Sequence, residues 1–354
     1  MLLTKQFGAV FTALIAIAAL ATLAMHSTAK GAKPSPNIIR PISYLTATSS
    51  FNIAVIDDKG TSSVTVNRDA SGSYPRWSPD GLQIGGNYKW LGNDHAIMTM
   101  SPSGANEQVV LTRGEFLAWN LMRGGVLDSS GFEFFSSNCW LGTGAMIFTA
   151  STTYEGETAP SNRLFIVDTS GVITPLTESA PHAANFDRDP HWSAALDKVA
   201  FATTGDFNPE LYAINPDGSG LQQITNFAGS VDQLRWPTWS PAGDRLVVSV
   251  RSGPASHWQL WILDIDLAQP NPGEGLGGRV TFLDPFKVIN GGGGYVQTAA
   301  WSPDGNRIVF SRTVYDSRNR RFFELVIANV TSGAESVIKR TTSNIELPDW
   351  NPIP

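Results

Sequence analysis

A five-residue phrase recurs along the chain and limits its fold more than any other feature. Trp-Ser-Pro-Asp-Gly occurs at Trp77–Gly81 and at Trp301–Gly305, and a third copy at Trp239–Gly243 differs at one position. Successive copies, including weaker ones, lie 47 to 63 residues apart. Such spacings exceed those of helical solenoids and suit β-propeller blades with loop insertions. The tryptophans that mark the repeats are Trp77, Trp140, Trp192, Trp239, Trp301 and Trp350.

The clearest copy predicts four short strands. It opens with Asp189–Trp192, and the apolar residues of Lys198–Phe201, Leu211–Ile214 and Leu221–Thr225 then alternate as in half-buried strands. Between the last two lies Asn215–Gly220, in which proline and glycine supply the dihedral angles of a tight turn. One repeat is therefore one four-stranded blade.

The two ends of the chain predict a shared blade. Pro348–Trp350 begins a repeat that has no following strands, whereas Phe51–Ile56 and Ser63–Val66 read as the third and fourth strands of a blade that lacks its tryptophan strand. Pairing the termini would close the ring and remove exposed sheet edges. The predicted fold class is all-β, a six-bladed β-propeller of four-stranded antiparallel blades.

Pro-x-Trp-Ser-Pro-Asp-Gly before an apolar strand, together with Leu-Tyr-x-x-Asn-x-Asp-Gly-Ser-Gly, resembles the TolB-like six-bladed propeller family over residues 44–354. The resemblance implies the fold, but such propellers include both binding proteins and enzymes. TolB itself has an α/β domain before its propeller, where this chain has a short segment. A role of that domain in an envelope-spanning complex is therefore not expected here.

The N-terminal segment predicts export. Lys5 precedes an apolar run from Gly8 to Met25, and Ser27–Ala29 offers small residues for cleavage. We expect residues 1–29 to be a signal peptide, 30–43 a linker and 44–354 the propeller, with the protein periplasmic or secreted. The alternative is an uncleaved membrane anchor, since the run could cross a bilayer.

Composition excludes several classes of function. The 25 basic and 31 acidic residues show no basic patch, so no nucleic-acid partner is expected. No phosphate loop, paired-histidine zinc motif or nucleophile elbow occurs, so no cofactor is expected. Cys139 is the only cysteine and cannot form an internal disulfide. Its place beside Trp140 predicts a small buried hydrophobe rather than a nucleophile.

The loops predict which face of the propeller carries function. In a four-stranded blade, the loops between second and third strands and those between blades share one face, which we call the long-loop face. The short motif turns lie on the other face, the turn face. The histidines after the leader lie in or beside the long loops, and variable loops on a rigid scaffold commonly carry function. These histidines are His95, His182, His191 and His257.

The residue before each repeat tryptophan is a second signal, because strand alternation places it opposite the indole. These residues are Arg76, Cys139, His191, Thr238, Ala300 and Asp349. A wholly buried position between blades should be apolar. The polar side chains of Arg76, His191 and Asp349 therefore indicate either a polar central channel or ion pairs between blades.

Further polar residues near these positions complete a candidate ligand site at one end of the channel. Its members are Arg76, His182, Asp187, Arg188, Asp189, His191, Asp232, Arg235, Trp236, His257 and Asp349. Mixed charges beside an aromatic side chain suit a protein, peptide or glycan ligand, or a cation held by Asp187 and Asp189.

Two functions follow from these candidates. The first is a binding or scaffold protein that uses the long-loop face and the channel. The second is an enzyme, a lyase, hydrolase or cyclase, at the channel mouth, for which His182, His191 and the Asp187–Asp189 segment offer the local acid and base groups. The resemblance to TolB favours binding.

Overall fold

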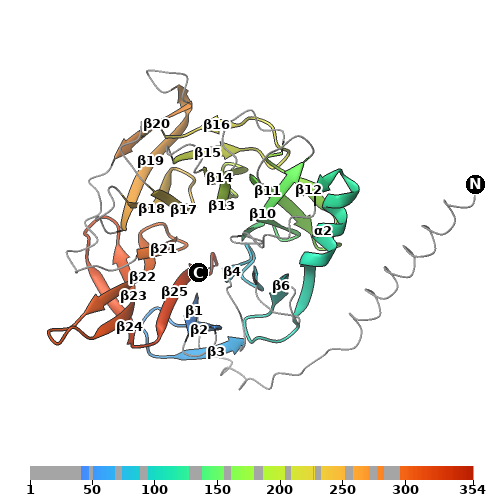
Figure 1. Ribbon diagram of the computed structural model, residues 1–354. Coiled ribbons are helices and arrows are strands. Elements are labelled where there is room, and N and C mark those ends of the chain that lie inside the picture. The colour runs from blue at the N-terminus through green and yellow to red at the C-terminus, as the bar shows by residue number, and fades with distance from the viewer. Residues whose placement is uncertain are drawn as a thin grey trace, which may run out of the picture. The chain divides into compact units, whose positions relative to one another are not determined.

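The computed structural model is a ring of six antiparallel sheets (Figure 1). It describes residues 41–47, 51–67, 74–87, 95–126, 138–154, 161–178, 186–203, 209–225, 227, 233–251, 258–270, 277–282 and 296–353. No helix within these ranges is long and apolar enough to cross a membrane. The predicted leader and residues 30–40 of the predicted linker lie outside the described residues.

Each sheet is one blade built on four strands, ordered here from the innermost strand outward, and one sheet has a fifth strand. Blade 1 comprises β4 (Arg76–Trp77), β5 (Ile84–Asn87), β6 (Ala96–Met100) and β7 (Gln108–Thr112). Blade 2 comprises β9 (Asn138–Leu141), β10 (Ala145–Tyr154), β11 (Ser161–Asp168) and β12 (Ile173–Pro175), with β8 (Gly125–Val126) added beside β10. Blade 3 comprises β13 (Asp187–Ser193), β14 (Lys198–Thr203), β15 (Glu210–Ile214) and β16 (Gln222–Gln223). Blade 4 comprises β17 (Gln233–Trp239), β18 (Arg245–Arg251), β19 (Gln259–Pro270) and β20 (Gly277–Phe282). Blade 5 comprises β21 (Val296–Trp301), β22 (Arg307–Tyr315), β23 (Arg321–Asn329) and β24 (Glu335–Thr341). Blade 6 comprises β25 (Asn344–Trp350), β1 (Ile42–Ala47), β2 (Phe51–Ile56) and β3 (Ser63–Asn67).

Blade 6 joins the two ends of the chain, as predicted. The last strand, β25, pairs antiparallel with β1, and Trp350 lies opposite Ile42. β2 and β3 then complete the sheet as its third and fourth strands. The first strand begins at Ile42, two residues before the predicted propeller boundary at Tyr44. This pairing closes the ring and confirms the predicted fold class.

The apolar core is divided among the interfaces between blades. Each of six clusters of buried side chains joins two neighbouring blades; five of them contain one repeat tryptophan, and the partly buried Trp192 packs against the sixth. The indole of a blade packs against the blade before it. Trp140 Nε1 donates a hydrogen bond to the Arg76 carbonyl (2.9 Å), and Trp301 Nε1 donates to the Thr238 carbonyl (3.0 Å). The repeated tryptophan therefore connects each blade to the preceding one.

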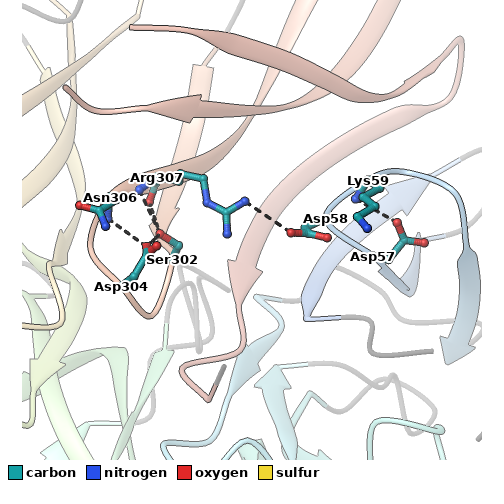
Figure 2. A network of polar contacts seen from close by, with 7 residues as sticks. All are labelled: Asp57, Asp58, Lys59, Ser302, Asp304, Asn306 and Arg307. Carbon is teal, nitrogen blue, oxygen red and sulfur yellow. Dashed lines mark hydrogen bonds and ion pairs between the residues drawn. The ribbon is translucent and has the colours of Figure 1, made fainter. Parts of the chain in front are cut away.

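The motif turns are fixed by their own side chains, as Figure 2 shows for blade 5. Ser302 Oγ donates to Asp304 Oδ1 (2.5 Å) and accepts from the Arg307 main-chain N–H (3.0 Å). The hydrogen bonds from Ser302 and from the Asn306 main chain lower the pKa of Asp304. The Arg307 guanidinium then pairs with Asp58 of blade 6 at 3.4 Å. The turn thus positions an arginine that joins two blades.

The connection between blades 1 and 2 contains a helix that the sequence interpretation treated as a loop. The helix, α2, spans Arg113–Met122. Thr112 and Glu115 form a capping box, in which each side chain accepts from the other residue's main-chain N–H. The buried ring of Phe116 packs edge-on against Phe148. The helix thereby covers blade 2 from outside its strands.

Candidate functional site

The residues before the repeat tryptophans meet at the centre of the ring. All six of these residues line one cavity of about 250 Å³, together with the tryptophans and several residues of the motif turns. Its lining includes Pro79, Ala194, Pro241, Pro303 and Pro352, each of which follows an innermost strand. The cavity therefore lies toward the turn face.

Arg76 and Asp349 lie side by side in this cavity. Arg76 Nη1 is 3.3 Å from Asp349 Oδ1, and the Trp77 main-chain N–H donates to Asp349 Oδ2 (2.7 Å). Burial raises the pKa of Asp349, against the opposing effects of Arg76 and the Trp77 N–H. The sequence alone allowed two explanations for these charges, a polar channel or ion pairs between blades. In the structure these two residues both line the cavity and join blade 6 to blade 1.

His191 is held as a neutral imidazole. Its Nδ1 accepts a hydrogen bond from the Trp239 main-chain N–H (3.2 Å), so the proton is carried on Nε2. Burial lowers the pKa of His191 to about 3, and the positive charge of Arg76 adds to the effect. The nitrogen that could accept a proton is therefore already occupied by the backbone of blade 4.

Cys139 is buried, as predicted. Its side chain is 4% exposed, and burial raises the pKa of the thiol to about 12. A nucleophilic cysteine needs a lowered pKa and access to substrate. The thiol instead packs between blades 2 and 3.

A bulge that contains a left-handed residue precedes the tryptophan in three innermost strands and redirects a side chain there. Asp189, Trp236 and Leu347 each have a left-handed φ, of 57°, 54° and 51°, and each precedes a Pro-x-Trp sequence. The register of β13, β17 and β25 shifts at these points. Bulges of this kind re-aim side chains without ending the strand. Since three blades share the bulge, it belongs to the repeat, and only the residue type differs.

Asp189 uses its redirected carboxylate to connect blades 3 and 4. Arg235 Nε donates to Asp189 Oδ2 (2.5 Å) and Arg235 Nη2 donates to Oδ1 (3.3 Å). The Trp236 main-chain N–H also donates to Oδ2 (3.2 Å). The Asp189 side chain is 1% exposed and that of Arg235 is 20% exposed. The negative charge of Asp189 is thereby compensated by Arg235.

A stack of two tryptophans between two arginines continues from this ion pair. The Arg235 guanidinium lies 4.6 Å from the Trp236 ring centroid, and the Trp236 and Trp258 centroids are 5.7 Å apart at 46°. Arg251 lies over Trp258 at 5.8 Å. Arg251 ends β18 and Trp258 precedes β19, so the stack lies at the long-loop end of blade 4. We call these four residues the Arg–Trp stack.

The remaining candidates divide into two groups. Asp187 is buried in β13, where its charge and that of Glu210 help burial to raise the pKa of Tyr212. Arg188 lies in the same strand, opposite Ala202. His182, Asp232 and His257 lie outside the described residues. The structure thus places Arg76, His191 and Asp349 at the centre, and Asp189, Arg235 and Trp236 together toward the long-loop face.

Within the described part of the chain, no three His, Cys, Asp or Glu side chains stand close enough together to hold a metal ion. Asp189, one of the two proposed cation ligands, accepts hydrogen bonds from Arg235 and Trp236. The cation at the channel mouth stays a prediction.

Sequence reasoning missed Arg251 and Trp258. A signal was present, because Trp236, Trp258 and Trp261 do not occupy the repeat position that the blade core requires. Two of these tryptophans lie beside a predicted loop, and each is close in sequence to an arginine or a histidine. Tryptophans outside the repeat position indicate a use other than blade packing.

Solved structures share this architecture. TolB from Acinetobacter baumannii is similar with a TM-score of 0.59 at 16% identity, over 88% of this chain and 66% of TolB. This chain therefore spans just under two thirds of that protein. The fold is a TolB-like six-bladed propeller.

Two further structures have similar folds. A putative TolB from Agrobacterium tumefaciens gives a TM-score of 0.54 at 14% identity, covering 86% of this chain and 91% of that one. A chain of a nidogen/laminin complex gives 0.55 at 9% identity, covering 88% and 98%. No family model matches the sequence. No curated protein sequence matches it either.

Proposed function

We propose that this protein is an exported binding or scaffold protein that holds a protein, peptide or glycan partner through its long-loop face and central channel. The observation that carries the proposal is the Arg–Trp stack, in which half-buried indoles and guanidinium groups lie together at the long-loop end. Tryptophan and arginine supply much of the binding energy in protein interfaces. The leader sequence supports export.

The chemistry of the channel supports binding over catalysis. A general base needs a free lone pair and a pKa near the working pH. His191 has its acceptor nitrogen occupied and its pKa lowered to about 3, and Cys139 has its pKa raised to about 12. Asp349 is paired with Arg76. These three groups act as connections between blades.

The buried cysteine permits a direct test of which face binds. Gln233, at the long-loop end of β17, and Leu82, in the motif turn of blade 1, are both exposed. Gln233→Cys and Leu82→Cys can each be coupled to a maleimide-polyethylene glycol chain, because Cys139 is buried and does not react. We expect the label at position 233 to abolish retention of partners from an envelope extract and the label at position 82 to leave it intact.

The bound material also separates binding from catalysis. Mass spectrometry before and after prolonged incubation should recover the partner chemically unchanged. Equal retention by the two labelled variants would contradict use of the long-loop face, and conversion of the bound material would favour the enzyme.

A further inference from the structure

Arg245 and Arg251 lie at opposite ends of β18, and each covers an indole. Only Arg245 also donates a hydrogen bond to a neighbouring blade. Arg245 lies 4.7 Å from the Trp301 centroid and donates through Nη2 to the Gly305 carbonyl (3.0 Å), so it joins blades 4 and 5. Arg251 covers Trp258 of its own blade. Within the described residues, its buried Nε has no hydrogen-bond partner and its guanidinium forms no ion pair.

Trp236 presents a second unsatisfied donor beside it. Its indole Nε1 is buried without a hydrogen-bond partner in the described part of the chain. A buried polar group without a partner costs roughly 1–3 kcal/mol. Two such groups lie in one cluster of three side chains that is linked through Trp258, and the described residues provide no acceptor for either.

The charge of the cluster defines the acceptor. Arg235 is neutralised by Asp189, so the uncompensated charge of the Arg–Trp stack is that of Arg251. A carboxylate matches this charge and can accept hydrogen bonds from arginine. The Trp236 and Trp258 rings pack on each other with their centroids 5.7 Å apart, and both side chains are half-buried, so they offer aromatic surface to an apolar or aromatic group.

We propose that Trp236, Trp258 and Arg251 form a subsite for an acidic side chain of a peptide ligand, an Asp or Glu beside an apolar or aromatic residue. The carboxylate accepts hydrogen bonds from the Arg251 guanidinium, and the neighbouring side chain packs against the two half-buried indoles. The inference rests on the proposed function and names the ligand class for the long-loop face. We infer that the carboxylate belongs to a peptide, because tryptophan and arginine together commonly anchor protein partners.

Two fluorescein-labelled peptides test the subsite, Gly-Leu-Asp-Leu-Gly and the same sequence with Asn in place of Asp. We expect fluorescence anisotropy to show the Asp peptide bound about 10-fold more tightly than the Asn peptide, because the hydrogen bond is charge-assisted. Arg251→Gln should remove this preference. Arg245→Gln is the matched control from the other end of β18 and should preserve it. Trp258→Ala should weaken both peptides alike, and circular dichroism should show native spectra for all three variants.

Several results would overturn the subsite. These are equal affinity of the wild type for the two peptides, no binding of either at millimolar concentration, or an unchanged preference in Arg251→Gln. Binding of a uronic-acid oligosaccharide without binding of the Asp peptide would assign the carboxylate to a glycan instead. If the label at position 233 still blocks partner retention in any of these cases, the subsite fails while the proposed function stands. If that label has no effect, the proposed function itself fails.

Discussion

Asp349 accepts a hydrogen bond from the main-chain N–H of Trp77 (2.7 Å), which connects the last strand of the chain to the first complete blade. The same relationship recurs where His191 Nδ1 accepts from the Trp239 N–H (3.2 Å). In both cases the residue before one repeat tryptophan holds the main chain of the next one. The same side chains therefore line the cavity and join the blades.

Replacement of Asp349 should destabilise the protein strongly. Asp349→Ala leaves Arg76 buried without its partner, and removing one member of a buried pair costs about 3–5 kcal/mol. The free energy of unfolding from urea titration measures this loss. Asp58→Ala is the matched control, because its pair with Arg307 is over a third exposed and should contribute about 0–1 kcal/mol. Equal losses of unfolding free energy in the two variants would show that the buried Arg76–Asp349 pair stabilises the fold no more than an exposed ion pair does.

His191 should make the fold sensitive to mild acid. Its pKa falls from 6.5 to about 3 on folding, so the folded state binds fewer protons and stability decreases as the pH drops below 6.5. Between pH 7 and pH 5 the loss should be about 2 kcal/mol.

His191→Asn isolates this effect, since the amide oxygen can still accept from the Trp239 N–H and does not titrate in this range. Asp349 has the opposite sign, because its raised pKa stabilises the fold at low pH and that contribution disappears as the pH rises. It is present in both proteins, so it cancels in the comparison. Parallel stability curves for wild type and variant between pH 7 and pH 5 would rule out this role of His191.

The fold could be predicted because each blade repeats the same packing contact and the same turn. A tryptophan packs on the previous blade, and serine, aspartate and glycine fix the turn after it, so three good copies define the frame for weaker ones. Trp140 kept enough of that pattern to mark blade 2. The helix α2 was missed because it lies between repeats, although Thr112 and Glu115 carried a capping signal.

The site could be predicted only in part, because the sequence of one repeat does not show which side chains of neighbouring blades contact each other. The charged residues Arg76 and Asp349 were identified from their position before the tryptophan, but they lie 273 residues apart and their contact depends on ring closure. The left-handed bulge at Asp189 turns its carboxylate toward Arg235 of the next blade. Strict strand alternation does not anticipate that change of direction.

Export should yield a mature chain that begins near Lys30. Ser27–Ala29 provides the small residues that processing requires after the apolar run. Intact-mass measurement of the protein recovered from the periplasm or medium determines the new N-terminus. Recovery of the uncleaved chain in a membrane fraction would instead support an N-terminal anchor. Ala29→Lys should block cleavage and serves as the reference for the uncleaved mass.

Ring closure should depend on β25 more than on any residue beyond it. Deleting the chain from Glu346 onward removes most of β25, exposes the edge of β1 and takes Trp350 out of the interface between blades 5 and 6. The loss of the buried indole alone should cost about 3–5 kcal/mol, and the unpaired strand should promote aggregation. Removing only residues 353–354 is the control, since Ile353 is 49% exposed. Thermal unfolding and light scattering should show the long deletion melting far below the wild type and aggregating, while the short one matches it. A long deletion that stays monomeric and melts within a few degrees of the wild type would mean that β1 does not need its C-terminal partner.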